Sequence, residues 1–178
     1  METYIALLRG INVSGQKKIK MDDLRNHLSE TGLSDVRTYI QSGNLILNSD
    51  KSKEQIKLDI EKEIQDVYDF YVPVKILNIT DLKKTIDNNP YSENNNDIKF
   101  LYVAFLYDLP DIEKVNNIKD YKFKDDEFII NDDIVYIYCP GGAGKTKITN
   151  NFFEKKLDLV ATSRNWKTTL KLLELSEE

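Results

Sequence analysis

The chain has 178 residues, of which 40% are hydrophobic and 31% charged, and its formal net charge is -5. This balance is typical of an ordinary globular protein with room for one ample core or two small ones. No apolar run approaches the roughly 18 residues that a membrane-spanning helix needs, and no basic region precedes the first short apolar run, as it would in a signal peptide. We therefore expect a cytoplasmic protein with no membrane partner.

Cysteine and histidine each occur once. The single Cys139 excludes an intrachain disulfide and cannot by itself form a cysteine-based metal site. His27 lies off the apolar stripe of the helix predicted around it, so we interpret it as an exposed helix residue and not as a catalytic base. We expect neither a metal nor a cofactor.

The first predicted elements are a strand and a short helix. A β-rich apolar run at residues 4–8 predicts a buried strand, and a long, basic, glycine-marked loop follows it. Apolar residues then recur at helical spacing between the acidic pair at residues 22–23 and Gly32. They are Met21, Leu24 and Leu28.

Two strands, a longer helix and a fourth strand follow. Residues 36–41 and 45–48 predict strands joined by a tight Ser42-Gly43-Asn44 connection. Ser52 and Gln55 form a capping box at the start of a helix, and residues 72–77 predict the last strand, with Pro73 favouring an edge position. The apolar face expected for the helix comprises Ile56, Ile60, Ile64 and Val67. The order β-α-β-β-α-β is that of a ferredoxin-like fold.

The remaining chain predicts a second α+β half. Residues 80–88 predict a short helix capped by Thr80, and the polar residues 90–97 predict a linker. Residues 98–178 then read as β-α-β-β-α followed by a C-terminal helix that carries Trp166. The fold class is therefore α+β, with domains at 1–89 and 98–178.

Charge is distributed unevenly. Residues 1–20 hold four Lys/Arg against one acid, and residues 139–171 hold seven against two. Residues 87–133 hold twelve Asp/Glu against five lysines. Basic loops in an acidic protein favour a local anion site, whereas a nucleic-acid binder usually has a broader basic face. The alternative is that all these charges belong to solvated surfaces.

Three familiar sites can be weighed against the sequence. The GKT at residues 144–146 suggests a nucleotide phosphate loop, but Cys139 stands where the first glycine is needed, so only a weaker anion-binding role for the glycine-rich amides remains. The strand at residues 45–48 lacks the aromatics of an RNA-recognition module, which disfavours a nucleic-acid partner without excluding it. Ser42 has no nucleophile elbow around it.

What remains is a set of polar residues in loops, which we take as candidate ligand contacts. Arginine gives a rigid fork for phosphate or carboxylate, and lysines add positive field around it. The order of elements leaves open whether these loops share an edge. The alternative to ligand contact is a structural role, in which polar side chains order loops and cap helices; it would apply to Ser42, Asn44, Thr162 and Asn165. The candidates are Arg9, Asn12, Lys20, Gln41, Ser42, Asn44, Lys147, Arg164 and Asn165, with Lys17 and Lys18 beside them.

Three motifs follow one another along the chain. They are RGINVSGQKKIKM from Arg9, TYIQSGNLILNS from Thr38, and GGAGKTKITNNFFEKKL with ATSRNWKTTLKLL after residue 140. In these motifs the chain resembles the uncharacterised bacterial family called domain of unknown function 1697. Ser14 and Thr146 depart from the family pattern. The resemblance implies an α+β fold with a ferredoxin-like part and makes Lys147 the family lysine, but it supplies no reaction.

Our leading hypothesis is a binding protein that takes an anionic ligand, phosphorylated or nucleotide-like, in a cleft between the two halves. Arg9, Lys20, Lys147 and Arg164 would contact the anion, and the remaining candidates would orient them. The alternatives are an enzyme, a transferase or hydrolase acting on such a ligand, and a structural or protein-interaction module without a small-molecule site. The sequence leaves the oligomeric state open.

Overall fold

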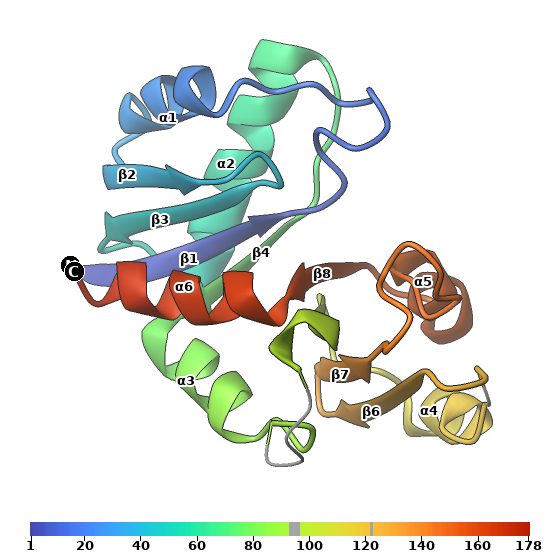
Figure 1. Ribbon diagram of the computed structural model, residues 1–178. Coiled ribbons are helices and arrows are strands. Elements are labelled where there is room, and N and C mark those ends of the chain that lie inside the picture. Colours follow the sequence, from blue (N-terminus) through green and yellow to red (C-terminus); the bar gives the residue numbers. More distant parts are fainter. Residues whose placement is uncertain (93–96, 122) are drawn as a thin grey trace. The chain divides into compact units, whose positions relative to one another are not determined.

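The computed structural model describes residues 1–92, 97–121 and 123–178, which form two four-stranded antiparallel sheets with helices (Figure 1). The α+β fold class is confirmed. The chain divides into two compact units, unit 1 with Met1–Lys83 and Leu172–Glu178, and unit 2 with Lys84–Lys171. The predicted linker at residues 90–97 lies in part outside the described residues.

Unit 1 has the ferredoxin-like order predicted for it. Its sheet has the strand order β2-β3-β1-β4, and every neighbouring pair is antiparallel. The strand β4 lies at the edge of this sheet and follows Pro73 directly, as the proline predicts. The elements are β1 (Glu2–Leu8), α1 (Met21–Ser29), β2 (Ser34–Tyr39), β3 (Asn44–Ser49), α2 (Lys53–Tyr68) and β4 (Val74–Asn78).

The core of unit 1 lies between the sheet and its two helices (Figure 1). Leu24 and Leu28 of α1 and Ile56, Ile60 and Ile64 of α2 are all fully buried in it, as their helical spacing predicts. Alternate residues of β1 and β3 face them from the sheet, because side chains of a strand alternate between its two faces. These residues are Tyr4, Ala6, Leu8, Leu45 and Leu47.

One expectation about the apolar face of α2 was wrong. Val67 is 38% exposed, and Glu61 is buried instead, with its Oε1 accepting a hydrogen bond from Val74 N at 2.9 Å. Glu61 follows Ile60 on the helix and so faces the entry of β4, where an unpaired backbone amide needs a partner. Ser52 does cap α2, since its Oγ accepts from Gln55 N at 3.3 Å.

The helix α3 (Ile79–Asp87) begins one residue earlier than predicted and has a different cap. Asn78 Oδ1 accepts from Asp81 N at 2.8 Å, and Asn78 N donates to Asp81 Oδ2 at 2.9 Å. This reciprocal pair is a capping box, so Asn78 caps the helix and Thr80 does not.

Unit 2 repeats the same topology. Its sheet has the strand order β6-β7-β5-β8, again antiparallel throughout. The sequence did not predict β8, so the second half also closes with a strand before its last helix. The elements are a 3-10 turn (Ile98–Phe100), β5 (Leu101–Leu106), α4 (Ile112–Ile118), β6 (Glu127–Asn131), β7 (Ile134–Tyr138), α5 (Asn150–Leu157), β8 (Ala161–Asn165) and α6 (Trp166–Ser176).

The repetition extends to single hydrogen bonds at the end of each central strand. Leu8 N donates to Gly43 O at 2.9 Å in unit 1, and Leu106 N donates to Asp133 O at 2.8 Å in unit 2. The residue that follows each strand donates in the same way to the segment before the last strand of the sheet: Arg9 N to Pro73 O at 3.0 Å in unit 1, and Tyr107 N to Val160 O at 2.9 Å in unit 2. The two units are therefore similar in backbone pairing as well as in element order.

No helix in the described part of the chain is both long and apolar enough to cross a membrane.

Candidate functional site

Three connections of unit 1 meet at the end of its sheet where the central strand β1 finishes. They are the loop 9–20, the turn 40–43 and the segment 69–73. Antiparallel pairing of β1 with β3 places the end of one strand beside the start of the other, and Leu8 N donates to Gly43 O at 2.9 Å. Arg9 N donates to Pro73 O at 3.0 Å, and Lys17 Nζ donates to Tyr71 O at 2.7 Å. The topology therefore brings the candidate loops of unit 1 together.

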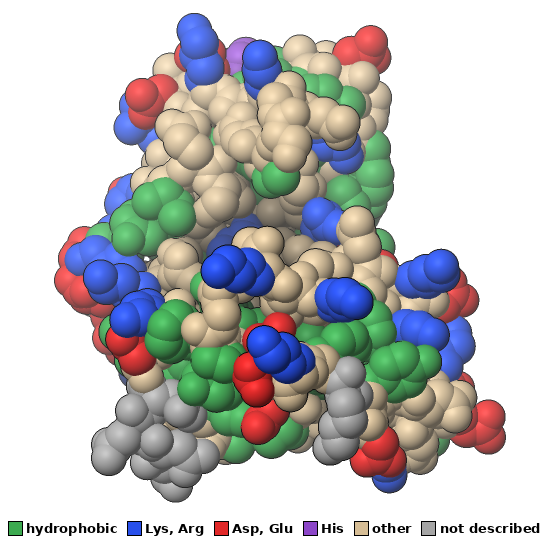
Figure 2. All heavy atoms as spheres, turned by 45° about the vertical axis from the view of Figure 1, so that its right-hand side comes forward, with side chains coloured by type: hydrophobic (Ala, Val, Ile, Leu, Met, Phe, Trp, Pro, Cys, Tyr) green, Lys and Arg blue, Asp and Glu red, His purple; other side chains and the backbone are tan. Residues whose placement is uncertain are grey.

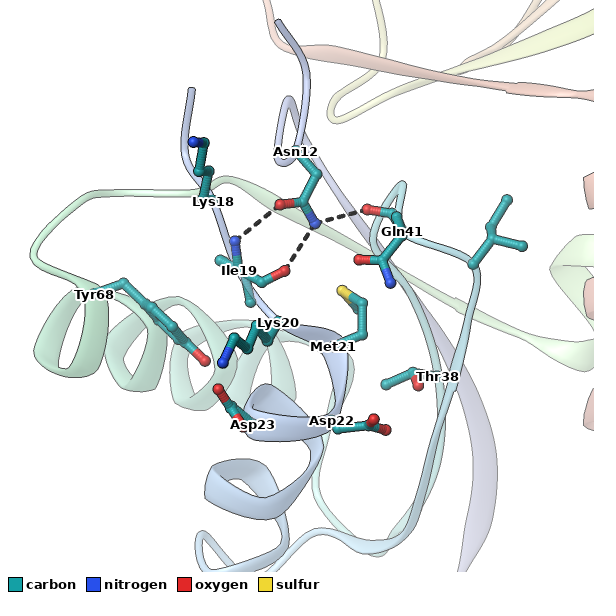
Figure 3. Close-up of a pocket in the computed structure, with 11 residues that line it drawn as sticks. Asn12, Lys18, Ile19, Lys20, Met21, Asp22, Asp23, Thr38, Gln41 and Tyr68 are labelled. Carbon is teal, nitrogen blue, oxygen red and sulfur yellow. Dashed lines mark hydrogen bonds between the residues drawn. The ribbon is translucent and has the colours of Figure 1, made fainter. Parts of the chain in front are cut away.

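Asn12 fastens the loop 9–20 to the turn 40–43. Its Nδ2 donates to Ile19 O and to Gln41 O, both at 2.9 Å, and its Oδ1 accepts from Ile19 N at 2.9 Å (Figure 3). Both the nitrogen and the oxygen of the Asn12 side-chain amide are thus hydrogen-bonded to backbone groups. Asn12 therefore orders the loop 9–20 against the turn 40–43.

The turn itself is held by Gly43 and Asn44. Asn44 is fully buried, and its Nδ2 donates to Tyr39 O at 3.0 Å and to Ser42 Oγ at 3.1 Å. Gly43 has a φ of +80°, and a Cβ there would lie 2.7 Å from Leu8 Cβ. Only glycine fits at this position, because both the backbone conformation and the space exclude a side chain.

A pocket of about 820 Å³ opens at this end of the sheet, in front of the start of α1 (Figure 3). Its volume lies within the range usual for small-molecule sites. Figure 3 shows the side chains of Lys20, Tyr68 and Asp23 pointing toward one another, with the Met21 sulfur and the Gln41 amide elsewhere in the pocket. The lining residues are Asn12, Lys18, Ile19, Lys20, Met21, Asp22, Asp23, Thr38, Ile40, Gln41 and Tyr68.

The start of α1 has no side-chain cap. Lys20 occupies the N-cap position and makes no capping hydrogen bond. In unit 2 the corresponding helix α4 is capped by Asp111, whose side chain accepts from Glu113 N and Lys114 N. The first amides of a helix lack partners within it and carry the positive end of its dipole. In unit 1 these amides therefore remain available beside the pocket.

Tyr68, the last residue of α2, adds a hydroxyl that sequence analysis did not predict. The oxygen is buried and, among the described residues, has no hydrogen-bond partner. Burial raises the pKa of Tyr68, and the carboxylates of Asp23 and Glu63 raise it further. The hydroxyl therefore stays protonated near neutral pH and can donate a hydrogen bond to a ligand. Buried polar atoms without a partner are rare in folded proteins.

The charges that line the pocket cancel formally. Lys18 and Lys20 are opposed by Asp22 and Asp23, and Asp22 also lies 3.6 Å from Arg25 Nη1. On the face drawn in Figure 2, Lys and Arg side chains lie among acidic and neutral ones.

The other three candidates lie in unit 2. Arg164 on β8 is buried, and its Nη1 donates to Thr162 Oγ1 at 2.9 Å and to Ser163 O at 2.8 Å. Asn165 Oδ1 accepts from Thr168 N at 2.7 Å and so caps α6. Lys147 is exposed in the loop before α5.

The glycine-rich loop of unit 2 does not have the geometry of a nucleotide phosphate loop. In such a loop the GK[ST] residues open the helix. Here α5 begins at Asn150, and its cap is Thr149, whose side chain accepts from Phe152 N at 3.3 Å. Thr146 instead accepts from Ile148 N at 3.0 Å. This agrees with the rejection of a phosphate loop from the sequence.

Neither Cys139 nor His27 is among the residues that line the pocket. Cys139 is buried, and burial raises the pKa of its thiol, which disfavours the reactive thiolate. His27 Nδ1 lies 3.7 Å from Glu63 Oε1 on the neighbouring helix. No group of three or more His, Cys, Asp or Glu that could hold a metal occurs among the described residues.

Seven of the lining residues were not functional candidates from the sequence: Ile19, Met21, Asp22, Asp23, Thr38, Ile40 and Tyr68. Met21 was assigned to the core stripe of α1, and Tyr68 is the ordinary end of an amphipathic helix. No spacing signal connects residues 38–40 with residue 68. Only the antiparallel pairing of β1 with β3 and the return of α2 toward β4 bring these parts together.

Comparison with known proteins gives a family and a solved structure. No curated protein matches the chain. The solved structure of the conserved bacterial protein SP0830 from Streptococcus pneumoniae is similar over 100% of this chain and 99% of that one, with 27% identity and a TM-score of 0.79. The model of a family described as "Protein of unknown function (DUF1697)" matches residues 1–136, which include all of the pocket but neither Lys147 nor Arg164. Since that match spans well over half of its length, the chain belongs to the DUF1697 family of proteins of unknown function.

Proposed function

We propose that the pocket of unit 1 binds a small molecule with an anionic group, phosphorylated or nucleotide-like. The observation that carries this proposal is the uncapped start of α1, which opens on a pocket lined by Lys18, Lys20 and the unpartnered hydroxyl of Tyr68. Backbone amides at a helix start, lysine amines and a protonated hydroxyl are all donors that suit phosphate or carboxylate oxygens.

Each lining group has a separate role in this proposal. Lys20 and Lys18 supply positive field, the first amides of α1 and the Tyr68 hydroxyl donate hydrogen bonds, and Asn12 keeps the loop 9–20 in place. The carboxylates of Asp22 and Asp23 weaken the field, so affinity depends on geometry more than on charge. Direct contact of the ligand with Arg9, Lys147, Arg164 or Asn165 stays a prediction.

The test is thermal stability at low salt against nucleotides, phosphosugars, coenzyme A derivatives and short single-stranded RNA. A ligand at a hundred times its dissociation constant stabilises by about 2.7 kcal/mol, which for a chain of this size raises Tm by about 5–10 °C. We expect Lys20→Met to weaken binding about tenfold and Asp23→Asn to strengthen it about fivefold, because the two changes alter the field in opposite directions. Recovery of the ligand after incubation distinguishes binding from turnover.

The matched control is Lys62→Met, which removes the same charge from the outer face of α2, where Lys62 pairs with Asp66. It should leave ligand binding unchanged. Equal responses of Lys20→Met and Lys62→Met would reduce the effect to net charge and would refute the pocket as the site. A panel without any shift would refute the proposal as a whole.

A second candidate function, a structural or protein-interaction module, is favoured by the hydrogen bonds of the motif residues. Asn12, Asn44, Arg164 and Asn165 all bond to backbone or hydroxyl groups of their own unit. In that case their substitution lowers stability and changes no ligand response. The same melting experiments, repeated with Asn12→Ala, separate the two candidates.

A further inference from the structure

Ile40 has a backbone conformation that its side chain disfavours. It lies in the turn between β2 and β3, and its φ is +52°. A β-branched residue at positive φ is an outlier, because its side chain is crowded by the neighbouring carbonyl. The side chain is also 48% exposed, so burial does not offset the cost.

The other residues with this conformation show how unusual Ile40 is. Apart from glycines, every other described residue at positive φ is polar and unbranched at Cβ, and most are Asn or Asp, which tolerate the conformation. Ile40 is the one β-branched residue among them. The others are Asn12, Ser14, Lys17, Asp35, Asp69, Lys124, Asp132 and Asp158. The turn itself therefore does not require isoleucine.

Ile40 lines the pocket together with apolar groups that no anion needs. Ile19 and Met21 are 3% and 5% exposed and also line it. Figure 3 shows the Met21 sulfur and the Gln41 side-chain amide pointing toward one another, away from the group formed by Lys20, Tyr68 and Asp23. The pocket thus has an apolar part with a hydrogen-bonding amide and a separate part with the cation and the hydroxyl.

From this division we infer that the ligand is a nucleoside phosphate, whose base packs against Ile40 and Met21 while its phosphate lies toward Lys20 and the start of α1. This inference rests on the function proposed above and narrows its ligand class. A flat base with a polar edge can pack on the apolar side chains and hydrogen-bond to the Gln41 amide. An acyl chain has no group that could hydrogen-bond to this amide, and a phosphosugar has no apolar surface to pack on the side chains. Strained residues of this kind concentrate at ligand sites.

The experiment compares AMP, GMP, CMP and UMP with ribose 5-phosphate, which carries the same sugar phosphate without a base. Dissociation constants are measured by isothermal titration for the whole protein and for Ile40→Asn and Ile40→Leu. We expect at least one nucleotide to bind the unchanged protein about tenfold more tightly than ribose 5-phosphate, because a single apolar contact can give a difference in affinity of this size.

Ile40→Asn should raise Tm without ligand, since asparagine tolerates positive φ, and should bring the affinity for that nucleotide down to that of ribose 5-phosphate. Ile40→Leu keeps an apolar side chain and should keep most of the tenfold preference. A merely structural role for Ile40 would change Tm but not the ratio of the two affinities.

Two results would overturn the inference. If ribose 5-phosphate binds as tightly as every nucleotide, the pocket takes a phosphorylated ligand without reading a base, and the proposed function stands alone. If Ile40→Asn keeps the nucleotide preference, the base does not contact this wall. Absence of binding by these probes and by the whole ligand panel would refute the proposed function as well.

Discussion

Gly43 is the residue on which the geometry of the pocket depends most directly. It brings the turn 40–43 against the end of β1, close enough that a Cβ would lie 2.7 Å from Leu8 Cβ and 2.9 Å from Ile11 Cδ1. Leu8 and Ile11 are both buried, so neither can move aside freely. The contact therefore sets the distance between the two connections that line the pocket.

We expect Gly43→Ala to lower the free energy of unfolding by about 2–4 kcal/mol, because overpacking adds to the strain of positive φ. Urea unfolding at neutral pH measures the loss. The matched control is Gly142→Ala in unit 2, where φ is +81° but no atom lies within 4 Å of the added Cβ. It should cost about 1 kcal/mol from backbone strain alone. Equal losses at the two positions would show that close packing at Gly43 contributes nothing.

At the scale of elements, Asn165 decides how α6 begins. Its Oδ1 accepts from Thr168 N at 2.7 Å, and its carbonyl accepts from Thr169 Oγ1 at 3.1 Å. We expect Asn165→Ala to destabilise the protein by about 1 kcal/mol and Asn165→Asp to leave stability nearly unchanged, because aspartate caps helices equally well. Thermal unfolding measures both variants.

The same pair of variants tests the earlier assignment of Asn165 to an anionic ligand. A carboxylate there would repel such a ligand while preserving the cap. Loss of ligand binding in Asn165→Asp with unchanged Tm would therefore assign the side chain to the ligand. Unchanged binding would leave it with the helix alone.

Elements with a strong apolar period were predictable, and elements defined by their neighbours were not. The stripe of Leu24 and Leu28 and the cap at Ser52 identify α1 and α2 because the signals are local. The strand β8 has the sequence ATSRN, in which polar residues obscure any alternation. It is a strand because β5 pairs with it along its whole length, which no local pattern reveals.

The candidate site was predictable to the same extent. Asn12, Lys20 and Gln41 were identified from polar loops, and the antiparallel pairing of β1 with β3 brings these loops to one end of the sheet. The sequence could not assign Asn12 to the backbone of its own site, since that role depends on Ile19 and Gln41 being within reach. Nor could it bring Tyr68 to the pocket, since the burial of that hydroxyl and its place in the lining depend on the fold.

At the scale of the whole molecule, unit 1 is discontinuous in sequence. Residues Leu172–Glu178 belong to it, although all of unit 2 precedes them. Leu172 is 1% exposed, Lys83 Nζ lies 2.7 Å from Glu177 Oε1, and Arg37 Nη1 lies 3.6 Å from Glu178 Oε2. The end of α6 is thus an integral part of unit 1.

We expect deletion of residues 172–178 to destabilise unit 1 by about 3 kcal/mol, mainly through the loss of buried Leu172, since exposed ion pairs contribute little. Hydrogen exchange should then increase more in β2 and α3 than in β6 and β7. Deletion of residues 177–178 alone removes the two ion pairs and should cost less than about 1 kcal/mol. An equal increase of exchange in both units would contradict this assignment.

The discontinuity has a consequence for biosynthesis. Residues 84–171 leave the ribosome as one uninterrupted stretch, so unit 2 has its complete strand set during translation. Unit 1 begins earlier but lacks Leu172 until all of unit 2 has been made. The nascent chain therefore holds unit 1 with all four of its strands but without the end of α6 for as long as the second half takes to be translated, and during that time it depends on chaperones or on its own partial stability to avoid aggregation.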